Sequence, residues 1–276
     1  MGSYAVYSGT SMATPFVAGS AALLLSVKGK SKHVASEART LFQTTAHVIP
    51  SSKTDGDPLQ TVAQQGAGLI NVYNAIRSTT HISCGEMILN DTAHFRPVYV
   101  YLFLFTSECL FQFFQLYRHT FTVKNDGKTS TSYKLRHIPA GTALTVREGT
   151  IFPSLGPVPL SDVSASAIII PDHFTLQPGE SQIVVTTFQL PAYGVDKSSY
   201  PVFSGFIEVA GPSAADSYHV SYLGLGASLR EKQILDNTDI FFGFKLPALL
   251  NATGQVQTRP TNYTFVNGDA PTLLGR

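Results

Sequence analysis

The sequence predicts a multidomain protein in which an α/β segment is followed by an all-β segment. Before about residue 80, apolar residues recur at helical spacing between polar or Gly-containing links. After that point, short β-rich runs alternate with turn residues. A length of 276 residues allows one large domain or two small ones. The change of texture therefore predicts a domain boundary near residues 79–86.

The composition excludes several classes of protein. The chain has 19 Lys and Arg against 18 Asp and Glu, for a net charge of +1, and its basic residues are scattered without interleaved aromatic residues. We therefore expect no nucleic-acid partner. Charged residues make up 13% and hydrophobic residues 43% of the chain. Low charge with ample apolar content favours a folded protein over a disordered one.

The first elements are a short strand at residues 4–8, a turn, and a helix from Met12 to Val27. Pro15 falls in the first turn of this helix, where its missing N–H costs nothing. Apolar residues lie on nearly every face, so we expect the helix to be buried all round. It is too short and too rich in small residues to be a convincing membrane span.

Two more helices are expected before the boundary. An amphipathic helix follows the basic link at residues 28–32, with its apolar face at Val34, Ala38, Leu41 and Phe42. Residues 50–58 form a polar loop. The third helix carries apolar residues at i, i+3, i+4 and i+7, beginning at Leu69.

About seven strands in roughly 140 residues then predict a β-sandwich of immunoglobulin-like type. The expected strands are Thr120–Lys124, Tyr133–Ile138, Ala143–Arg147, Ala167–Ile170, Gln182–Gln189, Phe203–Val209 and Tyr218–Leu225. The predicted domains are thus residues 1–80, residues 86–228, and a truncated tail at residues 229–276.

An aromatic segment at residues 97–119 differs from its surroundings. It holds eight of the 30 Phe and Tyr residues in 23 positions. Three interpretations remain open. The segment is a retained intron translated in frame, whose removal would join Arg96 to Thr120 in an ordinary strand. It is a buried strand pair, although no turn residue divides it. Or it is a membrane span, although Glu108 lies inside it at a cost of a few kcal/mol.

Three Asn-X-Thr sequons, beginning at Asn90, Asn251 and Asn262, are candidate glycosylation sites and point to an extracellular or cell-surface protein. The chain shows no signal peptide at its start, so this localisation requires it to be part of a longer protein. Its two cysteines, Cys84 and Cys109, form one bridge or stay free.

Ser11 is the candidate nucleophile. It lies between a predicted strand and the start of an apolar helix, where the helix N-terminus favours negative charge and a backbone N–H can bind an oxyanion. The alternative is that Ser11 only caps the helix. The string GTSMATPFVAG at residues 9–19 resembles, over all eleven positions, the serine-nucleophile motif of subtilisin-like serine proteases.

The resemblance implies a serine endopeptidase that acts on polypeptide substrates through an acyl-enzyme, with Ser11 as nucleophile, Thr10 supporting the oxyanion region, and no cofactor. The string GAGLINV at residues 66–72 resembles the end of that catalytic domain. Residues 120–125, 203–207 and 222–224 resemble the fibronectin type III-like domain that follows it in large secreted subtilases. The implied fold is the C-terminal fragment of a subtilisin-like α/β domain followed by a fibronectin type III-like β-sandwich.

The chain departs from this family in one respect. The family orders its triad Asp, His, Ser, and Ser11 has no room before it for the Asp and His motifs. No later histidine lies in a matching context, and each is expected to be a surface or satisfied residue. A hydroxyl without a base is a poor nucleophile, so we expect the chain alone to be inactive. The alternative is a non-catalytic extracellular binding or adhesion module with a protease remnant. No pair of His or Cys residues has metal-binding spacing.

Overall fold

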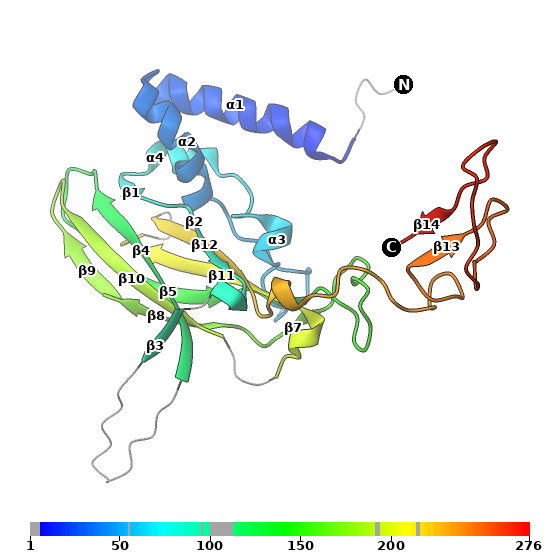
Figure 1. Ribbon diagram of the computed structural model, residues 1–276. Coiled ribbons are helices and arrows are strands. Elements are labelled where there is room, and N and C mark those ends of the chain that lie inside the picture. Colours follow the sequence, from blue (N-terminus) through cyan, green and yellow to red (C-terminus); the bar gives the residue numbers. More distant parts are fainter. Residues whose placement is uncertain (1–5, 55, 95, 100–112, 191–193, 214–215) are drawn as a thin grey trace, which may run out of the picture.

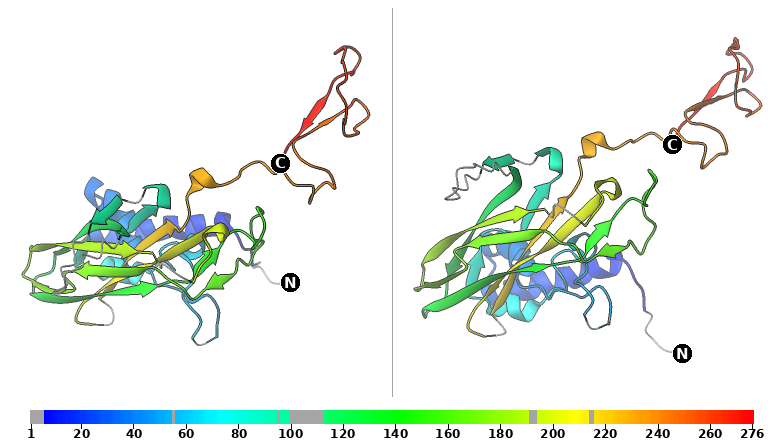
Figure 2. Two further views of the ribbon diagram at one scale, coloured as in Figure 1. Left: turned by 60° about the horizontal axis from the view of Figure 1, so that its bottom comes forward. Right: turned by 90° about the horizontal axis from the view of Figure 1, so that it is seen from below.

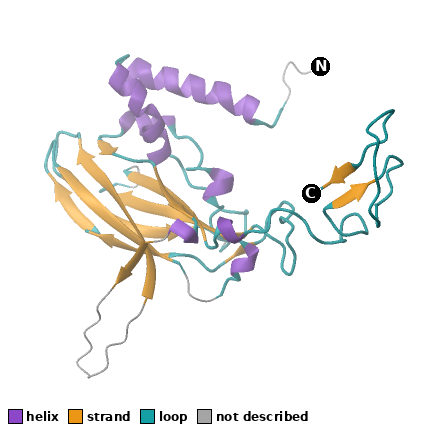
Figure 3. Ribbon diagram, viewed as in Figure 1, coloured by secondary structure: helices purple, strands orange, loops and turns teal. Residues whose placement is uncertain are grey.

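The computed structural model describes residues 6–54, 56–94, 96–99, 113–190, 194–213 and 216–276 (Figure 1). A helical segment comes first, two β-sheets follow, and a tail with a small sheet ends the chain (Figure 3). The described part is thus mostly β-structure with a short helical region at its start, as expected for a sandwich preceded by helices.

The described part of the helical segment contains four α-helices: α1 (Thr10–Lys28), α2 (Lys32–Thr44), α3 (Val62–Gln65) and α4 (Val72–Arg77). The first two confirm the predicted helices, and Ser31 Oγ caps α2 by accepting from the Val34 amide. The third predicted helix begins three residues late, at Val72. Leu69 is instead held in a bridge to His47, with which it exchanges two backbone hydrogen bonds of 2.8 Å. The predicted strand at residues 4–8 is absent from its described part, residues 6–8.

The prediction that α1 is buried on all sides is wrong for the residues that the structure describes. Only Ser20 and Leu24 are buried, while Phe16 and Leu23 are 61% and 51% exposed. The described elements that pack against α1 are α2 and α4, which lie on one side of it (Figure 1). By length and composition α1 is apolar enough to cross a membrane, a test that core helices of soluble proteins also pass.

The first sheet has five strands in the order β1–β4–β10–β8, with β3 also paired to β4. All of its pairings are antiparallel. Its strands are β1 (Thr80–Ile82), β3 (Arg96–Tyr99), β4 (Phe113–Asn125), β8 (Ser166–Ile170) and β10 (Ser181–Gln189).

The second sheet has seven strands in the order β2–β12–β11–β5–β9, with β6 paired to β11 and β7 to β6. The pairing of β2 with β12 is parallel and the others are antiparallel. The strands are β2 (Glu86–Asn90), β5 (Thr131–Pro139), β6 (Thr142–Leu144), β7 (Leu160–Ser161), β9 (His173–Leu176), β11 (Pro201–Ala210) and β12 (Ser217–Leu225). All seven predicted strands are found, although β6 ends at Leu144 rather than Arg147.

The core lies between the two sheets, because alternate residues of each strand point inward. In β10 these are Val184, Thr186 and Phe188, which are fully buried. The facing sheet contributes Ile207 and Val220, also fully buried. These apolar faces form one continuous core, which is what makes the two sheets a sandwich.

The helical segment covers part of the outer face of the seven-stranded sheet (Figure 2). Helices α2 and α3 both contact β12, and α3 also contacts β11. Polar contacts fix this packing. Arg39 on α2 forms a 2.9 Å ion pair with Glu86 on β2, and the Val62 amide of α3 donates to Ser204 Oγ on β11. The helices and the sandwich therefore share an interface with specific hydrogen bonds.

The aromatic segment is described only at its two flanks. Strands β3 and β4 pair antiparallel, with Arg96 opposite Leu116 and Tyr99 opposite Phe113. This supports pairing at the flanks, as in the strand-pair interpretation. Residues 100–112, and Cys109 with them, lie outside the described residues, so the three interpretations and the Cys84–Cys109 pairing stay open.

The tail forms its own small sheet from β13 (Ala248–Leu250) and β14 (Thr272–Leu274) (Figure 1). The last residue folds back on the tail, since the Asp236 amide donates to the Arg276 carbonyl. The Arg276 guanidinium lies 3.7 Å from the ring centre of Phe241 and 4.9 Å from that of Phe152. Cation–π contacts therefore attach the end of the chain to the loop that carries Phe152.

Candidate functional site

Ser11 is the second residue of α1 and is exposed. The N-cap position belongs to Gly9, and no side chain caps this helix. The alternative that Ser11 serves as the cap is therefore wrong. Its hydroxyl makes no hydrogen bond to any described residue, while its neighbour Thr10 accepts the Thr14 hydroxyl on its carbonyl at 2.9 Å. The structure thus leaves the Ser11 side chain open to a reactant.

The local sequence explains this placement. Gly9 has φ +151°, which residues with a side chain rarely adopt, and its carbonyl accepts from the Met12 and Ala13 amides. The chain can thereby turn sharply into the helix. Pro15 is the sixth residue of α1, not part of its first turn as predicted. Since proline has no N–H, the Ser11 carbonyl loses its normal partner four residues later.

The helix start gives Ser11 a suitable electrostatic setting. N–H groups in the first turn have no acceptor within the helix, and the helix dipole places partial positive charge there. No acidic side chain lies in the first turn of α1 to oppose this charge. A negative oxygen formed beside Ser11 would be stabilised by the N–H groups at this end. Thr10 lies at the same helix end, where the motif predicts a supporting residue.

None of the eight histidines, all within the described residues, hydrogen-bonds to Ser11. Three of them hydrogen-bond to other side chains: His94 to Asp91, His137 to Tyr222, and His173 to Asp172. His81 Nε2 lies 3.6 Å from Glu37 Oε2. His219 differs, because its ring is largely buried and its Nδ1 atom has no partner among the described residues. Within the described residues, no histidine is therefore placed to act as a base for Ser11.

The string at residues 66–72 positions the helical segment. Gly68 has φ +118°, and a side chain there would meet the His47 carbonyl at 2.3 Å. Only glycine allows the two-way bridge between Leu69 and His47. Asn71 then caps α4 by accepting from the Asn74 amide at 3.0 Å. These contacts fix α4, which in turn packs on α1, the helix that carries Ser11.

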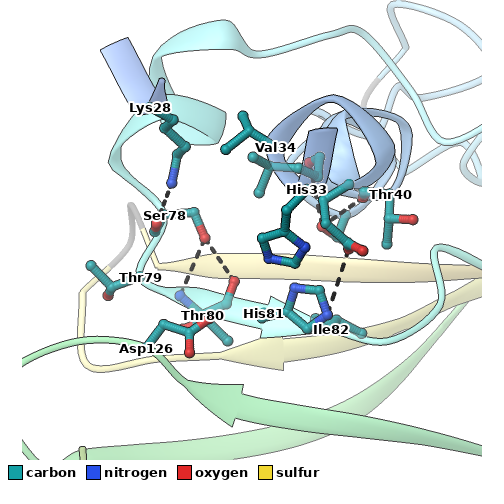
Figure 4. Close-up of a pocket in the computed structure, with 13 residues that line it drawn as sticks. Lys28, His33, Val34, Thr40, Ser78, Thr79, Thr80, His81, Ile82 and Asp126 are labelled. Atoms are coloured by element: carbon teal, nitrogen blue, oxygen red, sulfur yellow. Dashed lines mark hydrogen bonds and ion pairs between the residues drawn. The ribbon is translucent and has the colours of Figure 1, made fainter. Parts of the chain in front are cut away.

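A pocket of about 150 Å³ lies between the helical segment and β1 (Figure 4). The Lys28 ammonium donates to the Ser78 carbonyl at 2.9 Å, and His81 Nε2 lies 3.6 Å from Glu37 Oε2. Burial lowers the pKa of Lys28, and the nearby Asp126 opposes that shift. Within the described residues, no group of three or more His, Cys, Asp or Glu side chains is arranged to hold a metal ion.

The three sequons lie in different settings. Asn90 is exposed at the end of β2 with φ 59°, and Asn262 is exposed in the tail. Asn251 Oδ1 accepts from the amide and the hydroxyl of Thr253, at 3.0 and 2.7 Å, which closes a turn around the sequon. All three remain candidate modification sites.

Sequence reasoning missed a polar cleft formed by Arg136, Glu208 and His219. These residues come from β5, β11 and β12, so their separation along the chain hides the cluster. It missed the partly buried His137–Tyr222 pair for the same reason. Only the pairing of β11 with both β5 and β12 brings these strands together.

Comparison with known proteins identifies two regions. Residues 1–68 match the model of the Subtilase family, and residues 112–223 match that of the Fn3-like domain. No curated protein matches the chain.

Similar solved structures include a PapD-like domain of human CEP192, at 14% identity over 54% of this chain and 84% of that one, with TM-score 0.33. A FixG-related protein from Vibrio parahaemolyticus is 11% identical over 54% of this chain and 97% of that one, with TM-score 0.29. The E. coli chaperone DraB is 12% identical over 56% of this chain and 57% of that one, with TM-score 0.28.

The two family matches occur in the order that the motifs predict. The Subtilase match contains Ser11 with its surrounding motif and extends through Gly68, which holds the bridge to His47. The Fn3-like match spans most of the two sheets, from the start of β4 into β12. The chain therefore combines a segment that matches the Subtilase family with a later segment that matches an Fn3-like domain, in the arrangement that the motifs predict.

Proposed function

We propose that Ser11 is the nucleophile of a subtilisin-like serine endopeptidase. The observation that carries the proposal is the position of Ser11, exposed in the first turn of α1 within the segment that matches the Subtilase family. Its hydroxyl would attack a peptide carbonyl and form an acyl-enzyme, which water then hydrolyses. The N–H groups of the helix start, with Thr10 beside them, would stabilise the oxyanion.

The base that activates Ser11 is missing from the described chain. A serine hydroxyl is activated by an adjacent general base, usually histidine, and none of the eight histidines bonds to it. In subtilisin, a worked case for this mechanism, loss of the histidine alone costs a factor of about 10⁶ in turnover. We therefore propose that the chain is inactive by itself and that an Asp and a His from additional protease sequence complete the site.

The exposed surface of α1 supports this view. A helix with apolar residues on all sides is normally covered by other elements. Here Phe16, Val17 and Leu23 are each at least 46% exposed. The additional sequence would pack on this surface and bring the base to Ser11.

We further propose that the β-sandwich braces the protease segment in an extracellular protein. Its strands β2 and β11 hold α2 and α3 through Glu86 and Ser204. The Gly141 amide also donates to the Leu59 carbonyl at 2.9 Å. These contacts fix the helical segment on a rigid sheet.

A fluorophosphonate probe tests the proposal on the full chain and on a longer polypeptide encoded by the transcript upstream of the Met1 codon. We expect no labelling of the 276-residue chain and rapid labelling at Ser11 of the longer one. The Ser11→Ala variant should abolish the labelling, whereas Ser26→Ala on the same helix should not. Labelling of the longer protein at another serine, or peptide hydrolysis by its Ser11→Ala variant, would overturn the assignment.

A further inference from the structure

A polar cleft of about 670 Å³ opens at the edge of the interface between the helices and the sandwich. One wall is the loop after α2 and the start of α4. The other wall is the outer face of β5, β11 and β12. Clefts of roughly 300–1,000 Å³ with a few converging polar groups are typical ligand sites. The residues that matter here are Asn71, Asn74, Lys134, Arg136, Glu208 and His219.

Glu208 on β11 is the one carboxylate that lines the described cleft, and its side chain is only 10% exposed. Its Oε2 accepts from Arg136 Nε, and its Oε1 accepts from Ser217 Oγ at 2.9 Å. Burial alone raises its pKa, but these hydrogen bonds outweigh burial and leave the pKa lowered. Glu208 is therefore ionised, and both of its oxygens are already used.

His219 on β12 lies beside Glu208 and is equally buried, with a side chain 10% exposed. Its Nε2 is 3.9 Å from Glu208 Oε1, too far for a hydrogen bond, and its Nδ1 has no partner among the described residues. The Phe206 ring packs edge-on against it, with ring centres 6.0 Å apart. Burial lowers the pKa of His219, although Glu208 and a hydrogen bond with the Ala46 backbone oppose that shift. A buried polar atom without a partner is costly, so a change at the cleft wall that gives Nδ1 a partner would be favourable.

The remaining polar groups of the cleft are mostly unused donors. Lys134 makes no hydrogen bond, and no ion pair within 4 Å, to any described residue. Lys134 acts electrostatically on Asp172, whose pKa is lowered mainly by its hydrogen bond with His173 and only weakly by the Lys134 charge. Asn71 Oδ1 accepts from the Asn74 amide, which leaves its NH₂ group free among the described residues, and the Asn74 side chain has no partner there either.

Donors in the cleft thus outnumber acceptors, and its lining carries the positive charges of Lys134 and Arg136 against one negative charge from Glu208. A ligand that supplies negative oxygens would complete these hydrogen bonds. A metal cation would compete with Arg136 and Ser217 for the same carboxylate oxygens.

We propose that this cleft binds a small oxyanion, a carboxylate or a phosphate, through Lys134 and the amide groups of Asn71 and Asn74, with His219 beside it. The site is independent of Ser11 and of the proposed peptidase activity. It lies where the helical segment meets the sandwich, so an anion bound there contacts both parts.

The test is an NMR titration of the full chain with sodium acetate and with inorganic phosphate, with sodium chloride at equal ionic strength as the reference. We expect saturable shifts of the Asn71 and Asn74 side-chain amides and of the His219 ring with one or both oxyanions. Saturation by acetate alone assigns a carboxylate ligand, and saturation by phosphate alone assigns a phosphate. Shifts that chloride reproduces, or the absence of shifts, would overturn the proposal.

A matched pair of variants tests the role of the charge. Lys134→Gln should weaken oxyanion binding about tenfold, since a hydrogen bond to a charged group contributes that much. Lys128→Gln removes the same charge from an exposed turn and should leave the affinity unchanged. If the two variants bind the oxyanion with equal affinity, binding depends only on the net charge of the protein, and the proposed site at Lys134 is wrong.

Discussion

The backbone amide of Val62 donates a 3.0 Å hydrogen bond to the hydroxyl of Ser204, a residue 142 positions later in the chain. Val62 is the first residue of α3, so its N–H has no acceptor within the helix. Ser204 on β11 is only 1% exposed. One buried hydroxyl thus completes a helix start and joins the helical segment to the sandwich.

Removing that hydroxyl should weaken the protein. Ser204→Ala leaves the Val62 amide without its partner, and we expect the free energy of unfolding to fall by about 1–3 kcal/mol. Urea denaturation followed by circular dichroism measures it. Ser130→Ala, at an exposed loop position without a hydrogen bond of its side chain, is the control and should change stability little. Equal stability of the two variants would contradict this role of Ser204.

The partly buried His137 predicts a loss of stability in mild acid. Its Nε2 lies 2.7 Å from the Tyr222 hydroxyl, and burial lowers its pKa from 6.5 to about 4. Because the folded state resists protonation, the unfolded chain binds more protons between these two pH values. The stability from neutral His137 is therefore complete above pH 6.5 and is lost as the pH falls to about 4.

Partial solvent access reduces the size of this effect, which we expect to be about 2 kcal/mol. His137→Gln keeps a hydrogen-bonding group near Tyr222 but does not titrate, so its stability should depend less on pH over this range. Urea denaturation at several pH values compares the two proteins. An unchanged pH dependence would show that other groups, such as His219, account for the acid sensitivity.

Two glycine substitutions should act in opposite directions. Gly68→Ala places a Cβ 2.3 Å from the His47 carbonyl at φ +118°, and we expect it to destabilise the helical segment by about 3 kcal/mol. Gly19→Ala lies in α1 with nothing within 4 Å of the new atom. Because alanine favours helix, this second change should stabilise α1 by about 1 kcal/mol. Hydrogen exchange of the helical amides measures both, and a harmless Gly68→Ala would show that residues 66–72 dock differently.

The exposed face of α1 predicts self-association. Phe16 and Leu23 present apolar side chains that are 61% and 51% exposed, and such surfaces promote contact between copies. The double variant Phe16→Gln, Leu23→Gln should shift the full chain toward monomer in sedimentation velocity. Phe265→Gln, at a tail position 73% exposed, is the control. An unmodified chain that is already monomeric would contradict this prediction.

The sequon at Asn251 predicts a glycan when the chain is secreted from a eukaryotic host. Asn251→Gln and Thr253→Ala alter the same sequon by different residues, so each should remove the same glycan. Mass spectrometry before and after enzymatic deglycosylation measures the change. Ala252→Ser lies inside the sequon but preserves it and should keep the glycan. The prediction is wrong if either disrupting variant keeps this glycan, or if the unmodified chain lacks it.

The sequence predicts those elements whose signal is local. The apolar periodicity of α2 and the alternation in β10 follow directly from the side chains that face the core. Strands β1 and β2 escape prediction because they are short and depend on partners far along the chain, such as β4 for β1. The burial of α1 was overestimated, since periodicity shows that a helix is apolar but not which element covers it.

The same limit applies to the sites. Ser11 can be identified because its motif is a continuous string. The pairing of Glu208 with Arg136 cannot, because it depends on the register in which β11 lies beside β5. A one-residue slip of that register would turn Glu208 toward the core.

The pairing of β1 and β2 with the sandwich determines how this protein can be divided for study. Residues 80–90 precede the Fn3-like match, yet they supply the strand next to β4 in one sheet and the strand next to β12 in the other. A shortened protein that starts at the family boundary would leave the backbone groups of both neighbours unpaired, and open strand edges invite aggregation. A soluble version of the β-domain should therefore begin before Thr80.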